Sequence, residues 1–71
     1  MDRLTDIIRN YSEEENITEA SDFKKDLGIA SFDAVCMTAE INKVFGISID
    51  PTAFVKHRSV GEMWAYISSL I

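Results

Sequence analysis

The sequence predicts an all-α protein, a small four-helix bundle made of three longer helices and one short helix. Three segments place apolar residues at helical spacing, and no segment alternates long enough to build a sheet. The chain has 71 residues, 46% hydrophobic and 27% charged. This length and composition predict a single globular domain over residues 1–71.

The first helix is predicted from residue 2 to about residue 12. Four apolar residues fall at i, i+3, i+4 and i+7 and so share one helical face: Leu4, Ile7, Ile8 and Tyr11. Ser12-Glu13-Glu14-Glu15 has the form of a capping box, but no helical periodicity follows it. We therefore expect a solvated helix end that frays at this point.

Residues 16–30 form a long connection for so small a domain, and such a segment is either functional or disordered. Four apolar residues are spaced along it so that they can pin it to a core: Ile17, Phe23, Leu27 and Ile29. A disordered linker needs no such residues, so we expect an ordered loop that follows the surface. Gly28 permits the positive φ of a sharp turn.

The second helix is predicted to begin at Ser31, a residue type preferred at the N-cap, and to end at Phe45 before Gly46, which suits a C-terminal cap. Its expected core face consists of Ala34, Met37, Thr38, Ile41, Val44 and Phe45. The opposite side is apolar in its first half, with Phe32, Val35, Cys36 and Ala39, and then becomes polar at Asn42 and Lys43. Either a partner docks on this apolar stripe, or Val35 and Cys36 pack under the long loop.

Ile47-Ser48-Ile49 is expected to be an extended connector, because three alternating residues cannot form a sheet alone. Asp50-Pro51 suits an N-cap followed by proline at the first helical position. A short helix is then predicted over Thr52–Lys56, with Phe54 and Val55 turned inward.

The last helix is predicted to open at Ser59, with Glu62 three residues later completing a capping box. Apolar residues repeat along it at helical spacing: Val60, Met63, Trp64, Ile67 and then Leu70 or Ile71.

Twelve acidic and seven basic residues give a net charge of −5, which opposes binding to the phosphate backbone of nucleic acids. Residues 1–26 hold eight acidic and four basic residues, so most of the negative charge lies there. The charge and the absence of a long apolar seam favour a monomer. No apolar run is long enough to span a membrane or to form a secretory leader, so we expect a cytoplasmic protein.

Cys36 is the one cysteine, and His57 is the one histidine, so no internal disulfide and no metal-ligand cluster is expected. His57 lies between Lys56 and Arg58 and is expected to be a solvated turn residue without a catalytic partner. Cys36 is expected to be a small, partly buried side chain. With no catalytic constellation in so short a chain, we expect a protein that is not an enzyme.

The distinctive segment is Asp26-Leu27-Gly28-Ile29-Ala30-Ser31-Phe32-Asp33, a loop that turns into a helix with a serine at the junction. It resembles the signature of the acyl carrier protein family, in which the serine of Asp-Leu-Gly-x-Asp-Ser-Leu attaches 4′-phosphopantetheine. The resemblance extends over residues 4–71. It includes the loop Ile17–Gly28 without insertion or deletion, Phe45-Gly46-Ile47-Ser48-Ile49 at the end of the second helix, and the closing helix from Ser59 to Ile67.

The resemblance implies that Ser31 carries 4′-phosphopantetheine, derived from coenzyme A, and that acyl groups travel as thioesters on its thiol. The implied partners are a phosphopantetheinyl transferase and acyl-loading, elongating or tailoring enzymes. Residues expected to meet these partners are Phe32, Asp33, Val35, Cys36, Ala39 and Lys43. Residues expected to line an acyl cavity, besides packing the core, are Ile17, Phe23, Leu27, Met37, Ile41, Phe54, Val55 and Trp64.

Two departures from the family pattern bear on the partners. Ala30 stands where the family usually has an acidic residue, and Phe32 stands in place of leucine, which puts in question the transferase that modifies Ser31; Asp33 is expected to substitute in part. The second helix is also nearly neutral, where the family's is rich in acids. We therefore expect partners recognised through the apolar stripe, in a specialised polyketide, peptide or tailoring pathway rather than housekeeping fatty-acid synthesis.

One alternative remains from the residues alone. The chain is then an unmodified helical adaptor that uses the apolar stripe for permanent protein contact, and Ser31 is only a helix cap.

Overall fold

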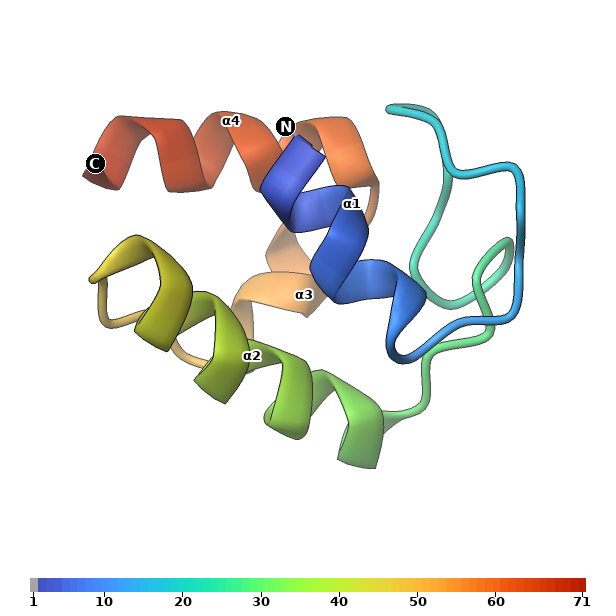
Figure 1. Cartoon of the computed structure of the whole chain (residues 1–71), viewed down its shortest axis with the longest axis horizontal. Helices are drawn as coiled ribbons and strands as arrows, with labels where there is room; N and C mark the ends of the chain where they lie inside the picture. Colours follow the sequence, from blue (N-terminus) through green and yellow to red (C-terminus); the bar gives the residue numbers. More distant parts are fainter. Residues whose placement is uncertain (1) are drawn as a thin grey trace.

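The computed structural model describes residues 2–71; Met1, the first residue of the predicted domain, lies outside the described residues. The chain forms four helices: α1 (Asp2–Arg9), α2 (Ser31–Phe45), α3 (Ala53–Lys56) and α4 (Val60–Leu70). In Figure 1, α2 and α4 form the lower and upper edges, α1 crosses between them in front, and α3 lies behind. Within residues 2–71 the one β-type pairing is an isolated bridge between Asp22 and Ser59, so the predicted all-α fold is confirmed.

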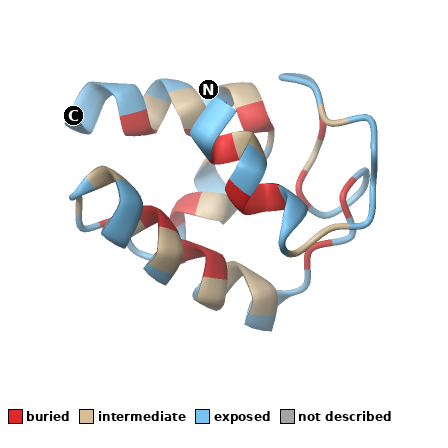
Figure 2. Ribbon diagram, viewed as in Figure 1, coloured by how far each residue is buried: buried red, intermediate tan, exposed pale blue. Residues whose placement is uncertain are grey.

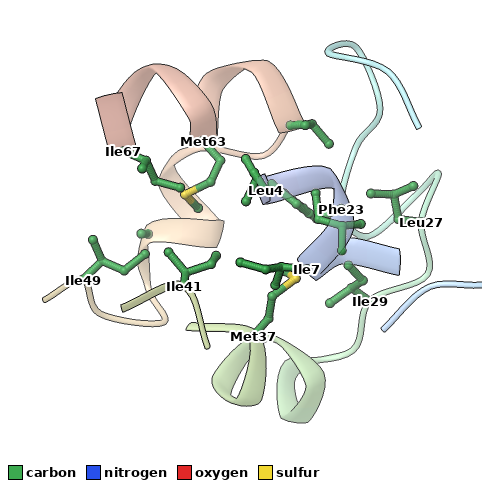
Figure 3. Packing of buried hydrophobic residues seen from close by; sticks show 13 residues of the cluster. Leu4, Ile7, Phe23, Leu27, Ile29, Met37, Ile41, Ile49, Met63 and Ile67 are labelled. Carbon is green, nitrogen blue, oxygen red and sulfur yellow. The ribbon is translucent and has the colours of Figure 1, made fainter. Parts of the chain in front are cut away.

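The helices and the long loop share one apolar core. Figure 3 shows side chains from α1, α2, α4 and the loop converging between the elements, and Figure 2 shows buried residues on each of these elements. The fully buried side chains are Leu4, Ile8, Met37, Ile41, Val60, Met63 and Ile67. Phe23, Leu27 and Ile29 of the loop are buried with them, and Ile17 packs against them half-buried. The prediction of an ordered loop pinned at these four residues is confirmed.

Helix α1 is shorter than the sequence predicts, since it ends at Arg9 rather than near residue 12. After Arg9 the backbone tightens into a turn, in which Asn10 N–H donates to the Ile7 carbonyl at 3.0 Å. Ser12 N–H donates to the Ile8 carbonyl at 3.0 Å, and the Ser12 hydroxyl donates to the Leu27 carbonyl at 2.8 Å. The expected frayed end is therefore wrong at Ser12, which is half-buried and tied to the long loop.

Helix α2 begins at Ser31 and ends at Phe45, as predicted, and Gly46 closes it in the left-handed conformation with φ 66°. Met37, Thr38 and Ile41 are buried. Val44 is not on the core face, because 40% of its surface is exposed. In this last turn Ile47 and Ile49 of the following connector cover the core instead.

The segment from Ile47 to Ile49 is an extended connector without strand pairing, as predicted. Asn42 on α2 holds it: its amide donates to the Ile49 carbonyl at 3.1 Å and its side-chain oxygen accepts from Ile49 N–H at 2.8 Å. The Asp50 carboxylate then accepts hydrogen bonds from the Thr52 N–H and hydroxyl at 2.9 and 2.8 Å. These contacts fix the turn that leads into α3.

Helix α3 begins at Ala53, one residue later than predicted, and is a single turn. Phe54 is half-buried and packs edge-on against Phe23, with ring centroids 4.9 Å apart. Val55 does not turn inward, since 69% of its surface is exposed. Each helical residue turns by about 100°, so Val55, two residues after Ala53, points away from the side on which Ala53 is buried.

Helix α4 is capped as predicted: the Ser59 hydroxyl accepts from Glu62 N–H at 3.2 Å and donates to the Glu62 carboxylate at 3.2 Å. Val60, Met63 and Ile67 are buried, whereas Leu70 and Ile71 are exposed beyond the core. Three backbone hydrogen bonds join the long loop to this helix start: Phe23 N–H to Arg58 O, Val60 N–H to Ser21 O and Gly61 N–H to Glu19 O, at 2.9, 3.0 and 2.9 Å.

Candidate functional site

Ser31 is the first residue of α2 and is exposed. The N-cap position belongs to Ala30, whose φ of −78° and ψ of 167° are extended, and no side chain caps the helix. This differs from the predicted cap role of Ser31. The first intrahelical bond runs from Ala34 N–H to the Ala30 carbonyl, so the earlier N–H groups of the helix point outward near Ser31.

The loop before Ser31 is held in place on both sides of Gly28. Gly28 has φ 64°, the left-handed conformation that the sequence predicts for a sharp turn. Ile29 follows it, buried in the core, and its N–H donates to the Phe23 carbonyl at 2.9 Å. Because Leu27 is buried as well, the chain reaches Ser31 from a fixed position and leaves its side chain in solvent.

A pocket of about 410 Å³ lies beside Ser31. Three segments line it: the start of α2, the α3 turn, and the loop residues around Phe23 together with Arg58. The lining residues are Asp22, Phe23, Lys24, Lys25, Ile29, Ala30, Ser31, Ala34, Val35, Pro51, Thr52, Phe54, Val55 and Arg58. The arrangement therefore places a hydroxyl next to a largely apolar hollow with cations among its lining residues.

Asp22 organises the turn that carries two of these cations. Its Oδ1 accepts hydrogen bonds from the backbone N–H groups of Lys24 and Lys25, both at 2.9 Å. The bond from Lys25 and then that from Lys24 hold the pKa of the Asp22 carboxyl below its ordinary value, and the positive charges of Lys25 and Arg58 act in the same direction. The Thr52 N–H and hydroxyl likewise lower the pKa of the Asp50 carboxyl, next to the other side of the pocket.

The residues expected to meet partners lie along α2 as a surface of mixed exposure. Phe32 is 77% exposed and Val35 is 52% exposed, so Val35 does not pack under the long loop. Ala39 and Lys43 are exposed, whereas Asp33 and Cys36 are half-buried. Cys36 is a free cysteine, partly buried as the sequence predicts.

The residues expected to line a cavity fall into two groups. Phe23, Phe54 and Val55 line the pocket beside Ser31. The others lie elsewhere in the protein: Ile17, Met37, Ile41 and Trp64 belong to the core or its edge, and Leu27 borders both the core and a second, more open depression. Trp64 packs against Phe45 with ring centroids 5.9 Å apart.

The cationic side of the pocket, formed by Lys24, Lys25 and Arg58, is not visible in the sequence. Lys24 and Lys25 are far from Arg58 along the chain, and the hydrogen bond from Phe23 N–H to the Arg58 carbonyl brings them together. No local pattern signals this pairing. Ala34 and Pro51 also line the pocket, where the sequence indicated a core position and a helix start.

His57 is not the solvated turn residue that the sequence predicts. It is half-buried, and its ring stacks on Tyr66 of α4 with centroids 4.5 Å apart and planes 16° from parallel. Within residues 2–71, no group of three or more histidine, cysteine or acidic side chains is placed to hold a metal ion. Among the same residues, no helix is both long and apolar enough to cross a membrane.

The chain is similar to known proteins over most of its length. Residues 2–67 match the family described as "Phosphopantetheine attachment site". Over 53 residues the chain is 34% identical to a protein named acyl carrier protein from Phytoplasma australiense, and the aligned part covers 75% of this chain and 70% of that protein. The chain therefore belongs to the acyl carrier protein family, whose members are carriers rather than catalysts, and its cofactor is 4′-phosphopantetheine.

Proposed function

We propose that Ser31 is the residue that carries 4′-phosphopantetheine, and that the chain shuttles acyl groups between biosynthetic enzymes. The observation that carries this proposal is the position of Ser31: exposed, at the first position of α2, with its hydroxyl not used as a helix cap. A hydroxyl in this position is accessible to a modifying enzyme. It also follows Leu27 and Gly28 at the spacing of the family signature.

The surroundings of Ser31 fit the phosphodiester of the prosthetic group. A phosphate on Ser31 would meet the outward N–H groups of the first turn of α2, and the positive end of the helix dipole would stabilise its charge. Ala30, the small residue before Ser31, leaves the approach open. The bound group supplies a terminal thiol that holds acyl groups as thioesters.

The chain's own residues position and shield the cargo. Gly28 and Ile29 fix the backbone before Ser31, so the attachment point stays at the edge of the pocket. Phe23 and Phe54 form an edge-on aromatic pair in the pocket lining, which offers apolar contact to an acyl chain. Val55 stands exposed on the lining of the same pocket.

The partners we propose are a phosphopantetheinyl transferase and acyl-loading and elongating or tailoring enzymes of a specialised pathway. Phe32 and Val35 expose apolar surface next to Ser31, where an enzyme that acts on the cargo has to approach. Between Ser31 and Phe45 the charged residues are Asp33, Glu40 and Lys43, which gives weak electrostatic steering. Equal turnover by a housekeeping ketosynthase and by a dedicated partner enzyme would contradict this assignment.

The proposal is tested by intact mass. The chain is incubated with coenzyme A, magnesium and a broad-specificity phosphopantetheinyl transferase under reductant, so that Cys36 cannot form a mixed disulfide. We expect a gain of one phosphopantetheinyl group, lost in Ser31→Ala and retained in Ser48→Ala, which removes an exposed serine elsewhere.

Two results of this experiment would count against the proposal. A gain that survives in Ser31→Ala would reject Ser31 as the attachment site. No gain with several transferases would favour the unmodified adaptor, for which the exposed Phe32 and Val35 provide the contact surface, or a dedicated transferase that tolerates Ala30.

A further inference from the structure

The pocket beside Ser31 combines apolar and cationic lining from different segments. The start of α2 contributes Ala34 and Val35, and the α3 turn contributes Phe54 and Val55. The loop and the segment before α4 contribute the basic residues Lys24, Lys25 and Arg58, besides the apolar Phe23 and Ile29 and the acidic Asp22. An occupant of this pocket therefore meets aliphatic and aromatic carbon together with basic residues.

This charge distribution is opposite to that of the whole chain. The net charge is −5, yet three of the seven basic residues line this one pocket against a single carboxylate. That carboxylate, on Asp22, already accepts the backbone N–H groups of Lys24 and Lys25. The excess of positive charge among the lining residues lowers the energy of an anion there, and the Asp26 carboxylate, which accepts from Asp22 N–H at 2.7 Å, offsets part of it.

The fold holds the three cationic residues on one side. Phe23 N–H donates to the Arg58 carbonyl at 2.9 Å, which joins the segment before α4 to the turn that carries Lys24 and Lys25. The isolated bridge between Asp22 and Ser59 continues the same pairing. Because all three side chains are exposed, each contact to an anion is weak, and the effect comes from their sum.

We infer that this pocket favours acyl groups that end in a carboxylate over acyl groups that end in a methyl group. The methylene chain packs on Phe23, Phe54 and Val55, and the carboxylate faces Lys24, Lys25 and Arg58. This inference rests on the proposed attachment at Ser31, which puts the cargo at the edge of the pocket. A phosphodiester on Ser31 offers the same anionic chemistry, so the experiment has to separate these two sources.

The test compares two cargoes of equal carbon number on the modified protein. After mass spectrometry shows the phosphopantetheinyl group on Ser31, the thiol is loaded with glutaryl or with pentanoyl, and thermal unfolding is measured for both forms. The observable is the midpoint of the glutaryl form minus that of the pentanoyl form. We expect this difference to fall by about 2–6 °C in the triple variant K24Q/K25Q/R58Q, and to fall with added salt.

A matched control separates the pocket from general charge effects. The variant R3Q/R9Q/K43Q removes the same three charges from positions that do not line the pocket, and it is expected to keep the wild-type difference. Equal behaviour of the two triple variants would overturn the inference. If K24Q/K25Q/R58Q does not fold, R58Q is compared with K43Q in the same way.

Two further outcomes keep the proposals apart. If the pocket variant lowers the midpoint of the unacylated phosphopantetheine form and leaves the difference between cargoes unchanged, the cations serve the phosphodiester, and the inference about cargo is wrong. If no mass gain occurs, the proposed attachment fails instead. Free S-glutaryl-pantetheine and S-pentanoyl-pantetheine are then titrated against the unmodified chain, and equal amide shifts around the pocket would overturn the preference.

Discussion

The hydroxyl of Ser31 has little to do for the helix that it begins, because Ala30 occupies the cap position. Ser31→Ala is therefore expected to change the free energy of unfolding by less than about 0.5 kcal/mol. Ser59→Ala is the matched comparison, since Ser59 is a true cap, and it is expected to lose about 1 kcal/mol. Denaturant unfolding of both variants checks this. A loss in Ser31→Ala as large as that in Ser59→Ala would assign Ser31 a capping role.

Gly28 shows how backbone geometry at one residue delivers Ser31 to the surface. Its φ is 64°, and a Cβ built there would meet nothing within 4 Å, so a substitution is strained by the backbone alone. We expect Gly28→Ala to lower the free energy of unfolding by about 1–2 kcal/mol. Gly28→Asn is expected to lose less, because asparagine tolerates the left-handed region better. Equal losses measured in denaturant would indicate a cause other than φ.

Asp22 makes part of the stability depend on pH. Its folded-state pKa lies below the ordinary 3.8, so its contribution is fully present above the unfolded pKa and is lost as the pH falls through the folded pKa. We expect Asp22→Asn to flatten the decline of stability below about pH 4, because the amide oxygen still accepts the N–H groups of Lys24 and Lys25. Unfolding at pH 6 and at pH 3 measures this, and an unchanged slope contradicts it. Asp50 contributes a decline of the same sign, which persists in the variant.

At the scale of elements, the way α2 holds the following connector explains where α3 begins. The Asn42 side chain satisfies both the N–H and the carbonyl of Ile49, whose side chain is buried. Asn42→Ala leaves both backbone groups without these partners and is expected to cost about 1–3 kcal/mol of unfolding free energy. Asn10→Ala removes an exposed hydrogen bond to Glu40 and serves as the control, with a change within about 0.5 kcal/mol. Similar losses in the two variants would show that the connector needs no such bond.

Over the whole molecule, the elements could be predicted well because their signals are local. The apolar period identified α2 and α4, and Gly46 and Ser59 mark helix ends through their own conformation and side chain. One error arises from a distant contact, since Ser12 bonds to Leu27 of the long loop instead of fraying into solvent. The error at Val55 is local, because Ala53 takes the inward position of the single turn α3.

Some residues of the candidate site could also be predicted from the sequence, and others could not. Ser31 could be found from its motif, and Phe23 and Phe54 from their apolar spacing. The cationic side of the pocket could not, because Arg58 meets the Lys24–Lys25 turn only through the pairing of Phe23 with Arg58. Sequence periodicity contains no information on which loop lies beside which helix start.

The pairing of Phe23 with Arg58 also determines which part of the pocket lining can move. The amides of Phe23, Val60 and Gly61 join the long loop to α4 and to the segment just before it. Helix α3, in contrast, is one turn whose amides bond only to residues three or four earlier. Hydrogen exchange is therefore expected to show two rates around one pocket, slow at the three cross-linking amides and fast in α3. Uniform exchange would contradict this. If α3 exchanges faster, we expect an acyl chain to enter the pocket by a movement of α3 while the loop and α4 stay in place. The time that an acyl thioester stays inside the pocket would then depend on how fast this single helical turn opens.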